Sequence, residues 1–459
     1  MTPWRPSLEG HRGPTYLALA NAIADAIESG ALTPGARLPP RRDLAHDLGI
    51  SVNTVSSAYV EAERRGHVVG EVGRGTFVRR RSEETFTGGH PEGHIDLSIC
   101  RPCVLHDQIP KLRDALRTAA DDPDLAAMLW CRPLIGLPPH RLAAARWLYK
   151  MGMPADPADI VITNGCAHGM LVALSTIVEP DDVVVTDALT DHGLISLASF
   201  LHFNLRPLAS DRDGLIPDAV EAAVRKGGVK ALVTTPNLNN PTSSLMPAER
   251  REKIAAICHQ YGVAIVEDDV FGALVEDRPP PLSSFHPDDS YYVTSFTKVS
   301  VSGLRVGFLV GPPKNTQRLA ARVRTTSWMA TPLVADIAAR WIEDGTMDEI
   351  VAGQRRELAA RQALVEHYLA EFDTISHPTG PNVWINLPGD WRADGLVRQL
   401  QAQGVLVTAS EPFVVGRSAG PHAVRLSVGG AETRADLERA LELVRADLSQ
   451  RPEPALIDV

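Results

Sequence analysis

The spacing of apolar residues divides the chain into two parts with different patterns. In residues 1–80 the apolar positions recur at helical spacing, whereas from residue 96 short apolar runs alternate with helical stretches. Residues 81–95 are polar, contain several glycines and show neither pattern, which predicts a linker. We therefore expect an N-terminal domain over 1–80, a larger domain over 96–447 and a short tail over 448–459.

The N-terminal part predicts three helices followed by a β-hairpin. The first helix covers residues 15–29, and its apolar face is formed by Leu17, Ala20, Ala24 and Ile27. A short second helix over 41–48 is followed by a glycine, and Ser51 is a favourable N-cap for a third helix. Two short helices joined by a tight turn predict a helix-turn-helix. Residues 67–78 alternate around glycines, which predicts a hairpin with Arg74 at its tip.

A helix-turn-helix followed by a basic hairpin has the chemistry of a DNA-binding unit. In the third helix Asn53 and Ser56 point away from the apolar face, which consists of Val55, Ala58, Tyr59 and Ala62. Small polar side chains there can reach base edges in the major groove, while Arg42 and Arg74 can hold phosphates. The alternative is a three-helix packing module with incidental arginines, which periodicity alone does not exclude.

The charge distribution agrees with an anionic partner for this part of the chain. Residues 1–80 hold ten arginines, no lysine and eight acidic residues, a net charge of +2, whereas the whole chain carries −10. The motifs PGARLP, RDLAHDLGIS, NTVSSAY, RGHV and GRGTFV follow one another in order. This segment resembles the DNA-binding domain of GntR-family bacterial transcription regulators. The resemblance implies binding to double-stranded operator DNA through Arg42, Ser51, Asn53, Ser56 and Arg74. Val52 stands where some members carry a basic residue, so the base preference stays open.

The larger part predicts an α/β domain with a mostly parallel sheet. Apolar runs typical of buried strands lie at 159–163, 183–186, 230–235, 263–268 and 291–296. Helical stretches lie between them at 165–178, 191–201, 214–225 and 247–261. Ligands of such sheets bind at the carboxyl ends of the strands. The polar residues that follow the strands are therefore the candidates for a site.

Those polar residues suit a phosphorylated aldehyde. Lys298 can form a Schiff base, and Ser295, Thr297, Arg305 and the helix that begins near Gly165 can hold a phosphate. A carboxylate such as Asp268 can keep a pyridine nitrogen protonated. Each residue alone has an ordinary structural explanation: Lys298 a surface position, Asp268 a helix cap and Arg305 an ion pair. Their order and spacing together favour the site.

Residues from about 95 to 447 closely resemble the fold-type I aminotransferases. The matching motifs are ITNGCAHGM, TTPNLNNPTSS, AIVEDDVFGAL, SFTKVSVSGLRVGFLVGP and AVRLSVGG. The resemblance implies pyridoxal 5′-phosphate on Lys298, Asp268 at the pyridine nitrogen and Asn240 at the phenolic oxygen. Arg425 would hold the carboxylate of a substrate or effector. The residues implied for the phosphate are Gly165, Cys166, Ala167, Ser295, Thr297 and Arg305.

Three departures from the aminotransferase pattern concern the cofactor ring. The usual tyrosine after the EDD sequence is replaced, because Val270 and Phe271 occupy that stretch. The usual NPTG is NPTS, ending at Ser243, and the aromatic residue that stacks on the ring is absent, which leaves His192 as a candidate. Loss of the tyrosine hydroxyl argues against fast transamination more than against cofactor binding.

The combination of both parts resembles the MocR subfamily of GntR regulators. We expect a PLP-dependent transcription regulator that senses an amino acid or related amine by aldimine exchange at Lys298, while a C-terminal lobe of about 345–447 closes. By resemblance the protein is a homodimer, with a head-to-tail arrangement. An aminotransferase in which catalysis is the main role is the alternative, and a DNA-binding protein with a vestigial, cofactor-free large domain is a third.

The composition mainly excludes classes of protein. No apolar run approaches the ~18 residues of a membrane span, and the N-terminus shows no secretory signal, so we expect a cytoplasmic protein. The five cysteines are scattered, with Cys100 and Cys103 forming one lone CxxC, and predict reduced thiols and no metal site.

Overall fold

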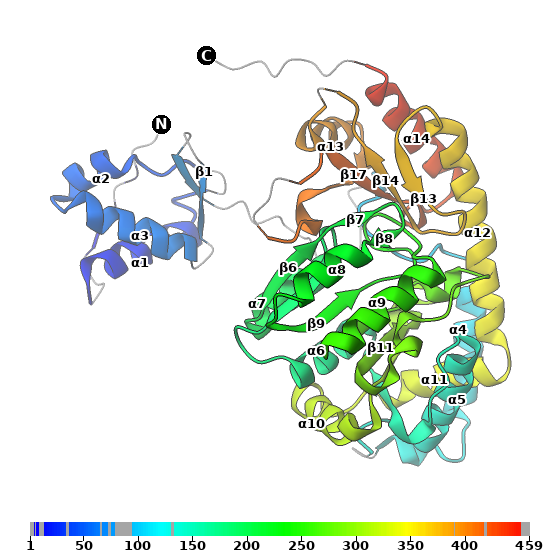
Figure 1. Ribbon diagram of the computed structural model, residues 1–459. Coiled ribbons are helices and arrows are strands. Elements are labelled where there is room, and N and C mark those ends of the chain that lie inside the picture. Colours follow the sequence, from blue (N-terminus) through cyan, green and yellow to red (C-terminus); the bar gives the residue numbers. More distant parts are fainter. Residues whose placement is uncertain are drawn as a thin grey trace. The chain divides into compact units, whose positions relative to one another are not determined.

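The computed structural model contains two compact units, residues 1–90 and 91–459, each of which is considered by itself (Figure 1). The structure describes residues 4, 6–8, 13–33, 36–64, 67–71, 75–78, 94–129, 133–389, 391–416 and 420–450. In this part of the chain no helix is long and apolar enough to cross a membrane.

The first unit is a helix-turn-helix with a β-hairpin. Its elements are α1 (Thr15–Glu28), α2 (Arg41–Leu48), α3 (Val52–Arg64), β1 (Val68–Glu71) and β2 (Gly75–Val78). Gly49 ends α2 in the left-handed conformation, which a residue without a Cβ adopts at little cost. The two strands pair antiparallel, and Leu38 donates from its backbone to Thr76. Predicted residue Arg74 lies outside the described residues.

The core of this unit confirms the inner face of α3 and corrects that of α1. Val55, Ala58, Tyr59 and Ala62 are buried as predicted. In α1 the predicted Ala20 is fully buried, as are Leu19 and Ile23, which were not predicted, whereas Leu17, Ala24 and Ile27 are only partly buried. The helix is apolar over most of its circumference, so more than one rotation satisfies the helical period, and packing against α3 selects between them.

The second unit is built on a seven-stranded sheet of order β4-β12-β11-β10-β9-β5-β6. Only β12 (Gly307–Val310) is antiparallel to its neighbours. The five predicted strands are confirmed, and β6 (Asn204–Leu208) and β12 were not predicted. The confirmed strands are β4 (Ile160–Thr163), β5 (Val183–Asp187), β9 (Val229–Thr234), β10 (Ala264–Asp268) and β11 (Ser290–Ser295).

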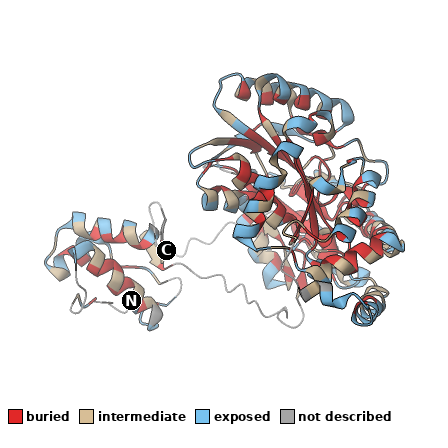
Figure 2. Ribbon diagram, turned by 90° about the horizontal axis from the view of Figure 1, so that it is seen from below, coloured by how far each residue is buried: buried red, intermediate tan, exposed pale blue. Residues whose placement is uncertain are grey.

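Each face of this sheet carries its own core. Val184 and Val266 point into the cluster that includes α6 (Cys166–Ile177) and α7 (His192–Leu201). Their neighbours Val185 and Ile265 point into the cluster of α8 (Pro217–Val224) and α9 (Ala248–Tyr261). Figure 2 shows the buried sheet between helices whose outer faces are exposed. Burial on both faces explains why the strands are continuously apolar rather than alternating.

Further helices and a smaller C-terminal lobe complete the second unit. The helices outside the lobe are α4 (Gln108–Ala120), α5 (Pro138–Lys150), α10 (Thr316–Thr326) and α11 (Pro332–Glu343). The lobe contains an antiparallel sheet of order β13-β14-β17-β16, a long helix and two shorter ones (Figure 1). Its elements are α12 (Thr346–Leu369), β13 (Thr374–Ser376), β14 (Asn382–Asn386), α13 (Ala393–Ala402), β15 (Val405–Leu406), β16 (Thr408–Ala409), β17 (Ala423–Ser427) and α14 (Arg434–Leu448).

Four short strands described in this unit, β3, β7, β8 and β15, lie outside these two sheets. β3 (Ile95–Asp96) pairs in parallel with β15 of the lobe, so the first described strand of the second unit is attached to the lobe. A small hairpin of β7 (Ser210–Asp211) and β8 (Gly214–Leu215) follows β6.

Candidate functional site

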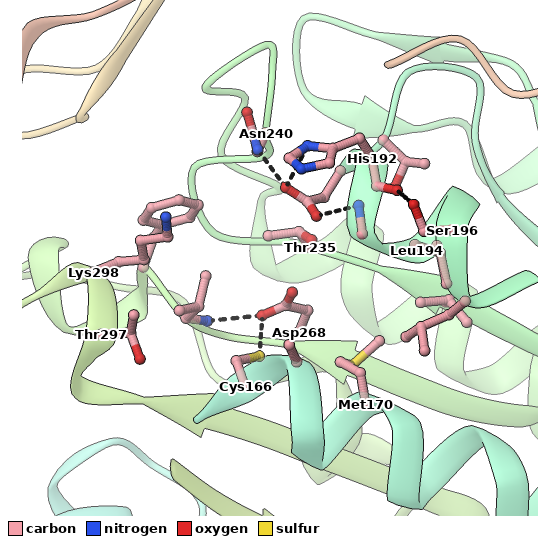
Figure 3. A pocket seen from close by; sticks show the side chains of 18 of the residues that line it. Cys166, Met170, His192, Leu194, Ser196, Thr235, Asn240, Asp268, Thr297 and Lys298 are labelled. Carbon is pink, nitrogen blue, oxygen red and sulfur yellow. Dashed lines mark hydrogen bonds and ion pairs between the residues drawn. The ribbon is translucent and has the colours of Figure 1, made fainter. Parts of the chain in front are cut away.

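A cavity of about 460 Å³ lies where the carboxyl ends of the parallel strands meet. Most of the predicted site residues point into it, from α6, α7, the loop after β9, β10 and the turn after β11 (Figure 3). The predicted residues that line it are Cys166, Ala167, His192, Asn240, Asp268, Thr297, Lys298 and Arg305. Gly165 and Ser295 are their immediate neighbours.

The start of α6 forms an anion cradle. Gly165 is the N-cap with φ 80°, and a Cβ there would lie 3.2 Å from Nη2 of Arg305 and 3.3 Å from Oγ1 of Thr297. A side chain at this position would therefore crowd the two donors. The Ser295 hydroxyl donates to Oγ1 of Thr297 over 3.1 Å. Backbone amides, an arginine and hydroxyls converge at a helix N-terminus, where negative charge is stabilised.

The Asp268 carboxyl group lies at the end of β10, is partly buried and has no cationic partner among the described residues. Its Oδ1 accepts from the Cys166 thiol and from the Val270 backbone amide, each over 3.1 Å (Figure 3). Burial raises the pKa of Asp268 to about 7, and the nearby charge of Asp191 adds to the rise. A protonated ring nitrogen would supply the positive charge that this carboxylate lacks.

Lys298 reaches the cavity from the short turn Phe296–Lys298 that follows β11. Its Nζ donates to the backbone oxygen of Cys100 over 2.5 Å, and the side chain is partly buried. The segment around Cys100 was not predicted to reach the site, because residues 97–104 have no regular period. Its carbonyl groups nevertheless hold two of the predicted cations in place, Lys298 and Arg425.

Arg425 comes from β17 of the lobe and is buried beside the cavity without lining it. Its Nη1 donates to Oδ1 of Asn240 over 2.9 Å, and its Nη2 donates to the backbone oxygen of Ser98. The guanidinium carbon lies 4.9 Å from the Phe413 ring centre. Its Nε is buried and has no hydrogen-bond partner in the described part of the chain. One donor of this arginine is therefore still unused.

Two residues between β5 and α7 complete the cavity wall. Thr190 and Asp191 line it, although neither was predicted as a site residue. Asp191 could have been found from its place as a helix N-cap just after a strand end. His192, the proposed ring-stacking residue, lies at the edge with 69% of its side chain exposed, and its role stays a prediction.

The predicted DNA-contacting residues gather at the start of α2 and α3. Arg42, Ser51 and Asn53 are exposed, and Ser56 is partly exposed. Ser51 also accepts a hydrogen bond from the Thr54 backbone amide over 3.1 Å, as its predicted N-cap role requires.

Comparisons with known proteins identify both units. Residues 92–444 match the family model for aminotransferase class I and II, and residues 15–78 match that for bacterial regulatory proteins of the gntR family. The chain belongs to the aminotransferase class I and II family. Together with the GntR domain, this is the architecture of MocR-type regulators, as the sequence motifs predicted.

Two transcription regulators align with this chain over nearly its whole length. The uncharacterized HTH-type transcriptional regulator YdeF of Bacillus subtilis is 28% identical over 457 residues, 96% of each chain. The vitamin B6 salvage pathway transcriptional repressor PtsJ of Salmonella typhimurium is 26% identical, over 91% of this chain and 94% of its own. An archaeal alanine:glyoxylate aminotransferase has the same fold as the second unit, with a TM-score of 0.71, 20% identity, and coverage of 78% of this chain and 91% of its own.

Pyridoxal 5′-phosphate is the cofactor of this fold, and the residues fit it. The cradle at Gly165 suits a phosphate, Asp268 suits a pyridine nitrogen, and Lys298 offers an amine. When bound, the cofactor supplies an aldehyde that condenses with amines and a ring that withdraws electrons. The chain's part is to hold the phosphate, keep the ring nitrogen protonated and position the lysine.

Proposed function

We propose that this MocR-type protein is a transcription regulator whose DNA binding responds to a small amine at the pyridoxal phosphate site. The observation that carries the proposal is the presence, in one chain, of an exposed helix-turn-helix and of a cavity lined by Lys298, Asp268 and Arg305. Residues 1–80 bind operator DNA, residues 81–95 link, and residues 96–447 sense. The protein acts in the cytoplasm.

The effector enters by exchange at Lys298. Its amino group takes the place of the lysine amine on the cofactor aldehyde, and Arg425 receives its anionic end group. Two features support this role for Arg425. Its Nε is unpaired, and its contact with the Ser98 carbonyl is one that a carboxylate can replace with a stronger, charge-assisted bond.

Closure of the lobe then alters the DNA-binding units. Arg425 belongs to the lobe, whereas Asn240, to which it donates, belongs to a loop of the sheet domain. An effector bound to Arg425 therefore interacts with both parts at once. Coupling of about 1–3 kcal/mol between effector and DNA is sufficient for a switch.

The regulator acts as a homodimer, with a head-to-tail arrangement. The support is an apolar stripe on α4, where Ile109 is 65% exposed and Leu116 is 46% exposed. Such side chains on one helix face are typical of a surface that another protein covers. A two-fold dimer also matches paired operator half-sites.

Catalysis as the main role is the second candidate. It is favoured by the presence of the lysine, aspartate and arginine of the site, and it is opposed by Val270 and Phe271, which occupy the stretch of the usual tyrosine and offer no hydroxyl. Rapid multiple turnover of an amino acid with a keto acid would favour the enzyme. A preparation that stays colourless with added cofactor would instead favour a vestigial domain.

The decisive experiment combines cofactor trapping with DNA binding. Borohydride reduction followed by mass spectrometry should find a pyridoxyl group on Lys298, and Lys298→Ala should carry none. Lys314→Ala, at an exposed lysine, is the control. A screen of amines should then find one that shifts the cofactor absorbance and changes operator affinity by roughly 5–150-fold. Wild-type protein that binds the cofactor, yet shows the same DNA affinity with every amine that shifts its spectrum, would contradict regulation.

A further inference from the structure

Asp191 uses its two carboxylate oxygens for two different purposes. Oδ1 accepts from the Gly193 backbone amide over 2.7 Å and caps α7. Oδ2 accepts from Nδ2 of Asn240 over 2.6 Å. The second contact is not needed for the cap, and it joins the start of α7 to Asn240, which lines the same cavity as Asp268 (Figure 3).

Both ends of the Asn240 amide are therefore fixed. Arg425 donates to the amide oxygen, and Asp191 accepts from the amide nitrogen. If the amide were flipped, its nitrogen would face the Arg425 donor and its oxygen would face the Asp191 carboxylate, and both hydrogen bonds would be lost. The amide nitrogen carries two hydrogens, and Asp191 takes one of them. The second remains for a ligand in the cavity.

The missing tyrosine makes this second hydrogen important. Val270 and Phe271 occupy the stretch of the usual tyrosine and offer no hydroxyl to the phenolic oxygen of the cofactor, so Asn240 becomes the more important donor to that oxygen. An amide that could rotate would form a weaker hydrogen bond to the phenolic oxygen, because a hydrogen bond weakens steeply as its angle departs from linear.

We propose that Asp191 is a positioning residue of the cofactor site, which holds the Asn240 amide so that one N–H faces the phenolic oxygen of bound pyridoxal phosphate. The inference rests on the cofactor and does not depend on which effector is sensed. It assigns to the N-cap of α7 a task that none of the motif residues performs.

A competing explanation is a direct effect of the Asp191 charge. The titratable and charged groups around it are Asp268, Lys298, Cys166, Arg305, Arg425 and His192. The two explanations predict opposite signs. Loss of an N–H donor to the phenolic oxygen raises the pH at which the bound cofactor releases its proton, whereas loss of a nearby negative charge lowers it.

The test uses Asp191→Ser in the full-length, cofactor-loaded protein. Serine still caps a helix but is too short to reach Asn240. We expect the dissociation constant for pyridoxal phosphate to rise about tenfold, the usual size of one hydrogen bond to a charged group. The midpoint of the cofactor's absorbance against pH should rise by about half a unit or more, in the same direction as for Asn240→Ala.

The double variant Asp191→Ser with Asn240→Ala completes the test. Because Asp191 acts through Asn240, the double variant should bind the cofactor no more weakly than Asn240→Ala alone. Multiplied effects would overturn the proposal, as would a midpoint that falls, or wild-type affinity in Asp191→Ser. If Asp191→Ser does not fold, Asp191→Asn keeps the side-chain size but turns an amide donor toward Asn240, and the same outcomes apply.

Asp373→Asn is the matched control. Asp373 accepts from the side-chain nitrogen of Asn386 over 2.9 Å in the same type of pair, at an exposed place in the lobe. It should leave cofactor affinity and absorbance unchanged. Wild-type protein that fails to bind the cofactor would instead overturn the cofactor assignment itself, which separates that failure from one confined to Asp191.

Discussion

Asp187 is a fully buried carboxyl group at the end of β5 that interacts with hydroxyl groups. Oδ2 accepts from Thr234 over 2.8 Å and Oδ1 accepts from Ser210 over 3.2 Å. Burial raises the pKa of Asp187 to about 6, and these two hydrogen bonds offset only part of the rise. The folded chain therefore binds this proton more tightly than the unfolded chain does.

That shift predicts a loss of stability as pH rises. The contribution of Asp187 is complete below about pH 4 and is lost as pH rises through about 6, because the folded state retains the proton longer. The free energy of unfolding of cofactor-free protein should fall by about 2–3 kcal/mol from this group. Asp187→Asn should flatten the curve in urea titrations between pH 4 and 8. An unchanged slope would show that Asp187 ionises normally in the fold.

Replacing Phe271 by tyrosine is expected to make the bound cofactor react faster with an amino acid. Phe271→Tyr should place a hydroxyl near the phenolic oxygen of the cofactor and stabilise its negative charge. The midpoint of cofactor absorbance against pH should then fall by about half a unit or more, and conversion to the pyridoxamine form by an amino acid should become several-fold faster. Phe200→Tyr, at the exposed edge of the same cavity, is the control. Identical spectra for the Phe271→Tyr variant and wild type would exclude this role for the missing hydroxyl.

At the scale of elements, the sequence predicted those strands whose positions follow from the local pattern of apolar and polar residues. The five central strands are apolar on both sides and bounded by polar turns, so their positions are evident. β12 is one continuous apolar run inside a motif that was interpreted as a phosphate site, and β6 is largely exposed, so neither has a buried-strand pattern of its own. Which face of α1 is buried depends on its packing against α3. The apolar period of α1 alone does not contain this information.

In the candidate site, too, residues in local motifs were predicted, whereas contacts between distant segments were not. Lys298, Asp268 and Arg305 were predicted because each follows a strand end in a recognisable motif. The contact of Lys298 with the Cys100 carbonyl, and that of Asn240 with Asp191, join segments about 50 to 200 residues apart. No sequence period records such contacts, because they are fixed by the packing of the whole unit.

The exposed start of α3 carries a prediction for DNA recognition. Asn53→Ala should reduce affinity for an operator fragment selected by wild-type protein by roughly 5–150-fold, the range of one good base contact. Fluorescence anisotropy would measure it, and cofactor affinity should stay unchanged. Val60→Ala, at an exposed position farther along α3, should bind DNA like wild type. Equal losses for both variants would mean that the helix had been destabilised rather than a contact removed.

At the scale of the whole molecule, the apolar stripe of α4 predicts an oligomer. Leu116→Lys combined with Ile109→Lys should shift the protein from dimer to monomer in sedimentation velocity across a concentration series, because two charges would be buried. Val60→Lys, of similar exposure in the DNA-binding unit, should remain dimeric. A wild-type protein that sediments as a monomer at all concentrations would contradict this use of the stripe.

β3 has a consequence for how a signal leaves the sensor. Ile95 donates to the Gly404 carbonyl and Leu97 to that of Leu406, each over 2.8 Å, and Gly430 lies so close to Asp96 that a methyl group there would collide with its carbonyl. The first described strand of the second unit is thus paired with a strand of the C-terminal lobe and not with the seven-stranded sheet. The proposed closure of the lobe over a ligand would therefore move the point at which the linker is attached, and would transmit ligand binding directly to the chain that leads to the DNA-binding unit.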